Sequence, residues 1–255
     1  MTSHRTNKPR SHGRPPLSPT RPRPYPTPTT QIIKSDLVIF LDLDETLVYT
    51  RRNRHNEPAG RTESNECEVL LEFKTDREWV TVFKRPYVDH FLRQLSNQFA
   101  EVYIFTAAVD WFADKVLDKL DPTKSIFTKR YYRDSCGYGW HPSEYVQNMY
   151  RKNVFQLDGI SIDLSPKRYV FLDDNWIYTI NDTRNTIPIS PFNDARRKHD
   201  KALLKALELI RLLDDVEDVR PVIDYLFDCS TRHTFQQLNI IMDPIPVDFL
   251  HLSDK

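Results

Sequence analysis

Residues 37–46 read Leu-Val-Ile-Phe-Leu-Asp-Leu-Asp-Glu-Thr, an apolar run that ends abruptly at Asp42. An uninterrupted apolar run of this length is typical of a strand that is buried on both faces. Two later runs have the same form: residues 101–105 end at Thr106, and residues 169–172 end at Asp173. Strands of this kind belong to parallel sheets, so the sequence predicts an α/β fold.

Amphipathic segments around these runs predict the helices that would cover the sheet. Helical periodicity fits residues 88–98, 111–120 and 201–213. Residues 68–74 and 79–84 instead alternate around Thr75 and Asp76, which predicts an antiparallel hairpin in an insert at about residues 50–83. The predicted architecture is a Rossmann-like parallel sheet flanked by helices, with a small inserted β-hairpin.

The first residues of the chain differ in composition from the rest. Residues 1–30 hold six basic residues, no acidic residue and eight of the 18 prolines. Proline at this density prevents a helix, so we expect a disordered basic tail at residues 1–31, a folded domain at 32–227 and a C-terminal extension at 228–255. The arginines of the tail suit nuclear targeting or an acidic partner, although a solubilising leader is the simpler interpretation.

The overall composition argues against several classes of protein. The chain carries 36 basic and 36 acidic residues, so no long-range field favours direct binding of nucleic acid. The sequence contains no apolar run that could span a membrane and no apolar signal core, which predicts a nuclear or cytoplasmic rather than a secreted protein. Three scattered cysteines predict neither a disulfide framework nor a zinc site. The oligomeric state is left open.

Polar residues at the ends of the predicted strands form the candidate site. In open α/β sheets ligands bind beyond the carboxyl ends of the strands, where Asp42, Asp44, Thr106, Asp173 and Asp174 would gather. Adjacent carboxylates repel unless a cation or a proton relieves them, and hard oxygen ligands suit Mg²⁺ rather than zinc. In such a pair, one carboxyl can attack phosphorus while the other moves protons. Each residue alone also fits an ordinary turn or helix cap, so the prediction depends on their joint placement.

Several motifs, taken in order, resemble those of a known family. The first is Phe40-Leu41-Asp42-Leu43-Asp44-Glu45-Thr46-Leu47-Val48, and residues 84–89, 105–108, 133–136, 171–174 and 215–219 follow it. The first motif resembles the signature of the haloacid dehalogenase superfamily. The set resembles its branch of small phosphatases that act on the C-terminal repeat of RNA polymerase II, with an NLI-interacting-factor-like domain. The similarity covers roughly residues 35–227 and six ordered motifs make it specific.

The resemblance implies an Mg²⁺-dependent protein serine/threonine phosphatase with an aspartyl-phosphate intermediate. Its substrate would be phosphoserine in the polymerase repeat or in a similar proline-rich peptide. By position, Asp42 resembles the nucleophile and Asp44 the general acid/base, while Thr106 would hold a phosphoryl oxygen. The resemblance also implies that Asp42, Asp44 and Asp174 bind the metal and that Asp173 supports the metal or the catalytic lysine.

The catalytic lysine is the least certain match, with Lys152 preferred over Lys167. Lys152 lies in Tyr-Arg-Lys-Asn-Val, where relatives have Tyr-Val-Lys-Asp-Leu, whereas Lys167 precedes the third apolar run and would lie at the opposite end of the sheet. The same resemblance places Phe112 and Arg133 near the substrate. An aromatic residue at helical spacing also fits the core, and Arg133 also fits a surface ion pair.

Two other functions remain as alternatives. The first is a non-catalytic binding domain of the same fold, because residues 119–122 and 218–221 are similar to the mitochondrial import receptor of the inner membrane. That receptor needs a membrane anchor, and its members often lose the paired aspartates. The second alternative is a phosphatase of small metabolites or lipids. We favour a phosphorylated protein or peptide as the partner, because the short insert would leave the site open.

Overall fold

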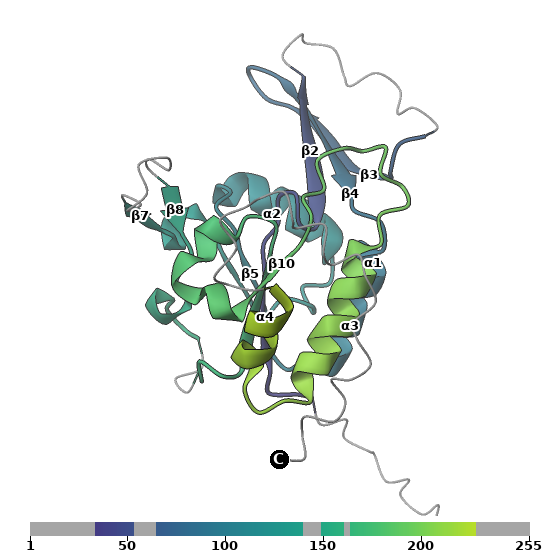
Figure 1. Ribbon diagram of the computed structural model, residues 1–255. Helices are drawn as coiled ribbons and strands as arrows, with labels where there is room; N and C mark the ends of the chain where they lie inside the picture. The colour runs from purple at the N-terminus through teal and green to yellow at the C-terminus, as the bar shows by residue number, and fades with distance from the viewer. Residues whose placement is uncertain (1–33, 54–64, 140–148, 161–163, 228–255) are drawn as a thin grey trace, which may run out of the picture. The chain divides into compact units, whose positions relative to one another are not determined.

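The computed structural model describes residues 34–53, 65–139, 149–160 and 164–227 (Figure 1). The predicted tail at 1–31, the extension at 228–255 and part of the predicted insert at 50–83 lie outside these residues. No helix in the described part is long and apolar enough to cross a membrane.

A parallel sheet of five strands forms the centre of the domain and confirms the predicted α/β class. Its order is β10 (Thr186–Pro188), β9 (Tyr169–Asp173), β1 (Val38–Leu41), β5 (Val102–Phe105) and β6 (Lys129–Tyr131). The three apolar runs are the three central strands, and their bounds agree with the prediction to within one residue. Because β1 pairs in parallel with both β5 and β9, the carboxyl ends of all three meet at one edge.

The two faces of this sheet bury different kinds of side chain. On one face, Ile39 and Leu41 join an aliphatic cluster to which the helices contribute, whereas Phe40 points to the other face. There its ring lies with those of Tyr103 and Phe171, each at 5.1 Å between centroids. Alternation along a continuous apolar run therefore builds two cores, one on each side of the sheet.

Four α-helices complete the aliphatic side, and three of them lie where the periodicity predicts. They are α1 (Val88–Gln98), α2 (Asp110–Leu120), α3 (Ala202–Asp214) and the unpredicted α4 (Val219–Phe227). Figure 1 shows α1 and α3 side by side. Helix α4 tolerates Pro221 in its first turn, where no helical hydrogen bond to the proline nitrogen is lost.

The predicted hairpin is present and gains a third strand. It consists of β3 (Val69–Lys74) and β4 (Trp79–Lys84), and β2 (Val48–Asn53) pairs with β4 on the other side. Tyr49 and Arg51 of β2 face one side of this small sheet, whereas Thr50 and Arg52 face the other. The sequence did not indicate β2 because its second half, Arg-Arg-Asn, lacks apolar alternation.

Shorter elements connect these parts. Strands β7 (Gly137–Gly139) and β8 (Met149–Arg151) pair in a two-stranded ribbon. The 3₁₀ helices of the described residues are η1 (Arg133–Ser135), η2 (Val154–Gln156) and η3 (Trp176–Asn185).

A buried carboxyl in η3 has only one hydrogen-bond partner within the described part of the chain. The carboxyl of Asp182 accepts a hydrogen bond from the Tyr169 hydroxyl. Its second oxygen is buried and has no hydrogen-bond partner among the described residues. Burial therefore raises the pKa of Asp182 to about 6.

We predict that Asp182→Asn stabilises the protein at pH 8. When the pKa of a carboxyl is higher in the folded than in the unfolded chain, the protein loses stability as the pH rises from the unfolded-state pKa to the folded-state pKa. The raised pKa corresponds to a gain of about 2–3 kcal/mol in the free energy of unfolding at pH 8, and this gain should vanish near pH 4. Urea titrations at both pH values measure it, with the exposed Glu208→Gln as a control. An equal gain at pH 4 and pH 8 would contradict this explanation.

Candidate active site

The central strands bring three predicted site residues to one edge. Asp42 follows β1, Thr106 follows β5 and Asp173 is the last residue of β9. Backbone hydrogen bonds continue the sheet past the strands: the Asp42 amide donates to the Leu172 carbonyl at 3.0 Å, and the Thr106 amide donates to that of Tyr131 at 3.0 Å. Three polar side chains are therefore buried beside one another on a rigid support.

Lys152 lies between two of these carboxylates. Its Nζ is 2.6 Å from Asp42 Oδ1 and 2.6 Å from Asp173 Oδ2, and the residue is only 1% exposed. The backbone amide of Lys152 donates to the Tyr178 carbonyl at 2.7 Å, which fixes the start of this side chain. Burial lowers the pKa of a lysine, but Asp173 and Asp42 outweigh it and raise the pKa of Lys152 above its ordinary value. Lys152 is thus a buried, permanently charged ammonium.

The acidic residues at this edge fit a hard divalent cation. Carboxylate oxygens of Asp42, Asp173 and Asp174 lie within 4.8 Å of one another. Burial, with Asp42 and Asp173 nearby, raises the pKa of Asp174 to about 8, so this carboxyl keeps its proton at neutral pH unless a further cation stabilises its charge. Oxygen ligands without sulfur or imidazole suit Mg²⁺. This group contains Asp173, the predicted supporting residue, whereas the assignment of Asp44 as a ligand stays a prediction.

Asp44 lies next to this cluster with a different partner. Its Oδ1 accepts a hydrogen bond from the Thr50 hydroxyl of β2 at 3.3 Å. Burial and the charge of Asp42 raise the pKa of Asp44 to about 6. A carboxyl with such a pKa holds its proton in mildly acidic solution and loses it readily, which suits a general acid/base.

The turn after Asp44 is held by two residues that the sequence analysis did not assign to the site, Thr46 within it and Arg85 outside it. The Thr46 hydroxyl accepts from the Asp174 amide at 3.1 Å and lies 3.2 Å from Asp174 Oδ1. The buried guanidinium of Arg85 donates to the Thr46 carbonyl at 3.0 Å and pairs with Asp200 at 3.1 Å. Thr46 belongs to the first motif and Arg85 to the second, so both motifs have a structural explanation at this site.

Phe112 lies in the aliphatic core and Arg133 lies at the edge of the site, and the expected contact of each with substrate stays a prediction. Phe112 is 3% exposed within the aliphatic cluster, because it lies on the apolar stripe of α2. Its neighbour Trp111 is 52% exposed, so a ligand could contact Trp111 rather than Phe112. Arg133 donates from Nε to the Ala107 carbonyl at 2.7 Å and its guanidinium lies 4.9 Å from the Tyr150 ring. Its predicted contact with substrate stays a prediction.

The fold and the site share one arrangement, in which a parallel sheet gathers carboxylates and one buried lysine at its carboxyl edge. The model of the NLI interacting factor-like phosphatase family matches residues 37–220. The chain therefore belongs to this family, which confirms the resemblance drawn from the motifs.

Curated relatives agree with this assignment. The chain is 36% identical over 186 residues to a probable C-terminal domain small phosphatase of Dictyostelium discoideum, covering 73% of this chain and 53% of the relative. It is 32% identical to the CTD nuclear envelope phosphatase 1B of Danio rerio, covering 73% of this chain and 70% of the relative. The chain spans between a third and about half of the length of the first three relatives.

A solved structure is also similar to the chain. It is that of Fcp1, described as an essential RNA polymerase II CTD phosphatase, with 20% sequence identity and a TM-score of 0.46. The match covers 71% of this chain and 51% of that one.

We predict that Lys152→Ala strongly lowers kcat, whereas Lys167→Ala leaves it unchanged. Lys167 forms an exposed ion pair with Glu217 at 3.2 Å, whereas Lys152 contacts two site carboxylates. Loss of a buried cation that stabilises a transferred phosphoryl group should lower kcat at least about a hundredfold. Lys167→Ala should stay near the unsubstituted protein. Steady-state kinetics with a phosphate ester measure both variants, and the reverse ranking would show that Lys152 is not the catalytic lysine.

Proposed function

We propose that this protein is an Mg²⁺-dependent protein serine/threonine phosphatase that forms an aspartyl-phosphate on Asp42. The observation that supports it most strongly is the position of Lys152 between Asp42 and Asp173, beside Asp174. A lysine held within an acidic cluster can neutralise a phosphoryl group that enters among the carboxylates. A binding domain needs no such set of buried ionisable groups, which favours catalysis over the import-receptor-like alternative.

In the first half of the reaction, Asp42 Oδ attacks phosphorus and the bond between phosphorus and the seryl or threonyl oxygen breaks. The proton on the carboxyl of Asp44 passes to the leaving oxygen, so the alcohol departs neutral. Lys152 stays charged and offsets the phosphoryl oxygens, and the Thr106 hydroxyl lies at the same edge to hold one of them. The products of this half are the dephosphorylated side chain and phospho-Asp42.

In the second half, Asp44 is a carboxylate and takes a proton from a water molecule. The resulting hydroxide oxygen bonds to phosphorus, and the bond between phosphorus and Asp42 Oδ breaks to release inorganic phosphate. Asp42 is then a carboxylate again, and Asp44 holds the proton that starts the next cycle. Bound among Asp42, Asp173 and Asp174, Mg²⁺ would supply charge neutralisation for the phosphoryl group.

The side chains around the site favour a peptide as substrate over a small metabolite or lipid. Trp111 is exposed beside Phe73, with ring centroids 6.5 Å apart, and the Arg52 guanidinium lies 5.6 Å from the Phe112 ring. Lys115 Nζ lies 4.7 Å from the Phe73 ring. The exposed groups among these are Trp111 and Lys115 of α2 and Arg52 of β2, which offer a peptide chain contacts beyond its phosphate.

Similar proteins support the same class of substrate. One relative, 34% identical over 183 residues, is the human carboxy-terminal domain RNA polymerase II polypeptide A small phosphatase 2, of which this chain covers 59%. We therefore propose phosphoserine in the polymerase repeat, or in a similar proline-rich peptide, as the substrate. A nuclear or cytoplasmic location follows from this proposal.

We predict that Asp42→Asn abolishes turnover and leaves the fold intact. The amide keeps the shape of the side chain but removes the attacking charge. Relief of the carboxylate crowding around Asp42 should leave the Tm unchanged or raise it. Hydrolysis of a phosphoserine peptide measures activity, and thermal unfolding monitors the fold. A variant that retains more than a trace of activity would exclude Asp42 as the nucleophile.

We also predict that beryllofluoride, a mimic of the phosphoryl group, binds at Asp42 only when Mg²⁺ is present. The incoming anion meets three carboxylates, and Lys152 alone does not offset them. Fluorine NMR with Mg²⁺ and with EDTA measures binding, and Asp42→Asn serves as the control that cannot form the adduct. Tight binding in EDTA would show that the site does not depend on a metal.

A further inference from the structure

A cluster of cations lies outside the catalytic edge, on the segment between β10 and α3 and on the first turn of α3. It consists of Arg196, Arg197, Lys198, Lys201 and Lys205, and we call it the basic platform. Residues 194–205 hold these five basic residues and two acidic ones in a chain whose net charge is zero. Positive charge is therefore concentrated in this segment, where Arg196 pairs with Asp194 and Arg197 with Asp200, and the proposed mechanism uses none of these cations.

The backbone beneath the basic platform is held in place by buried contacts. Phe192 and Ala195 are buried in a cluster with Phe83, and the Cys67 amide donates to the Ala195 carbonyl at 2.7 Å. At the far end, buried Asp200 pairs with Arg85. The cations are consequently presented on a fixed backbone, and a ligand would not have to order this segment when it binds.

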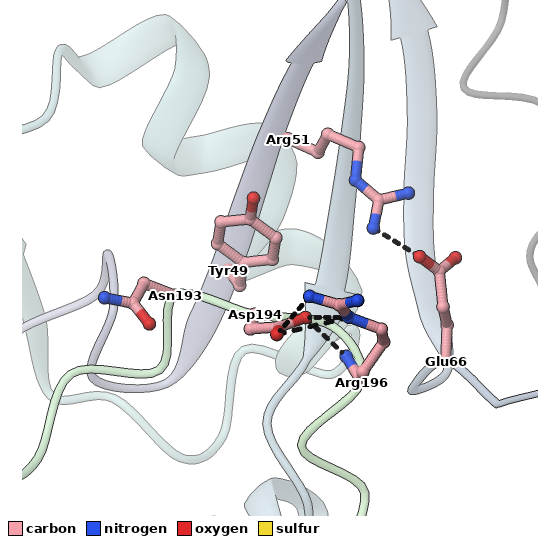
Figure 2. Close-up of a pocket in the computed structure, with 6 residues that line it drawn as sticks. All are labelled: Tyr49, Arg51, Glu66, Asn193, Asp194 and Arg196. Carbon is pink, nitrogen blue, oxygen red and sulfur yellow. Dashed lines mark hydrogen bonds and ion pairs between the residues drawn. The ribbon is translucent and has the colours of Figure 1, made fainter.

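A cavity of about 640 Å³ lies beside the basic platform (Figure 2). Six residues line it: Tyr49, Arg51, Glu66, Asn193, Asp194 and Arg196. Figure 2 shows that Arg51 comes from β2 and Arg196 from the segment before α3. Arg196 also lines a second hollow of about 370 Å³, together with Lys201 and Lys205. The cavity and the hollow therefore share Arg196, while Glu66 and Asp194 line the cavity and Asp200 lines the hollow.

The two arginines of the cavity differ in how strongly their present partners hold them. Arg51 lies over the Phe83 ring at 4.7 Å and pairs with Glu66, so its guanidinium is already oriented. Arg196 pairs with Asp194 at 2.9 Å, but these side chains are 66% and 37% exposed. An exposed pair of this kind contributes little to stability, so Arg196 can exchange Asp194 for a ligand anion. The planar fork of a guanidinium matches both phosphate and carboxylate groups.

The basic platform is connected to the catalytic edge through the backbone. The Phe192 amide donates to the Glu45 carbonyl at 2.7 Å, and Glu45 directly follows the proposed acid/base Asp44. Along β2, Arg51 follows Thr50, whose hydroxyl donates to Asp44. A polypeptide whose phosphoserine occupies the catalytic edge can therefore also reach the platform with another segment of its chain.

We propose that the basic platform, together with Arg51, is a second binding site for an anionic segment of the protein substrate. This inference rests on the proposed function. The segment carries phosphate or carboxylate groups and binds apart from the phosphoserine that is hydrolysed. Its binding raises the local concentration of that phosphoserine at Asp42 and lowers KM without changing the chemical step.

Peptide binding to the full chain tests this proposal, with Asp42→Asn present throughout to prevent hydrolysis. Three labelled peptides differ only in one segment, which contains four phosphoserines, four glutamates or four glutamines. In the test variant, Arg196→Glu, Lys198→Glu and Lys201→Glu reverse three charges on the platform. In the matched control, Arg93→Glu, Lys119→Glu and Lys124→Glu reverse three exposed charges elsewhere. Fluorescence anisotropy gives each Kd.

The platform variant should bind the glutamate and phosphoserine peptides at least about tenfold more weakly, whereas the control variant should not. Weaker binding of both peptides by the platform variant identifies negative charge as the feature that the platform recognises. Weaker binding of the phosphoserine peptide alone identifies the phosphate group. Equal binding of both anionic peptides by the platform variant and the control variant would overturn the proposal. A further variant with glutamine at Arg196, Lys198 and Lys201 removes the three charges without reversing them. Its affinity for the two anionic peptides should decrease by a smaller factor.

Hydrolysis of para-nitrophenyl phosphate separates this proposal from the proposed function. With Asp42 restored, the platform variant should hydrolyse this small ester at the rate of the unsubstituted protein, because the ester does not reach the platform. A large decrease in that rate would mean that the substitutions damage the catalytic edge and would count against a separate site. Absence of hydrolysis in the unsubstituted protein would contradict the phosphatase assignment, and the difference in peptide binding would still be measurable.

Discussion

The repulsion among carboxylates at one edge of the sheet is the constraint on which this structure depends. Asp42, Asp173 and Asp174 converge because they lie at, or just after, the ends of two neighbouring parallel strands, β1 and β9. Buried charges of one sign require a compensating cation, and Lys152 provides it at 2.6 Å from two of them. Burial, and then the charge of Asp42, raise the pKa of Asp44 toward the range useful for proton transfer.

A second buried cation holds the parts around this edge together. Arg85 donates to the Thr46 carbonyl in the turn after Asp44, to the Ser190 carbonyl after β10, and to Asp200 before α3. Removing one partner of such a buried pair leaves the other charge uncompensated. Arg85 therefore links the turn after Asp44 to the segment that carries the basic platform.

The small antiparallel sheet contributes side chains to two separate surfaces. Strand β2 points Thr50 and Arg52 toward the catalytic edge and Tyr49 and Arg51 toward the cavity in Figure 2. Because successive side chains of a strand point to opposite faces, a single strand can contribute to both. Strand β2 thus contributes Thr50 to the candidate site from one face and Arg51 to the cavity from the other.

The sequence by itself determined the central strands, three of the helices and the positions of the candidate carboxylates, because buried strands and amphipathic helices leave strong apolar patterns. Lys152 was accessible only through the motif around it, since 110 residues separate it from Asp42 and no local pattern reports such a contact. The pairing of β2 with β4 and the Arg85 network were decided by tertiary structure. Each depends on which distant segments pack together, and an exposed strand or a buried ion pair has no periodic signature in the sequence.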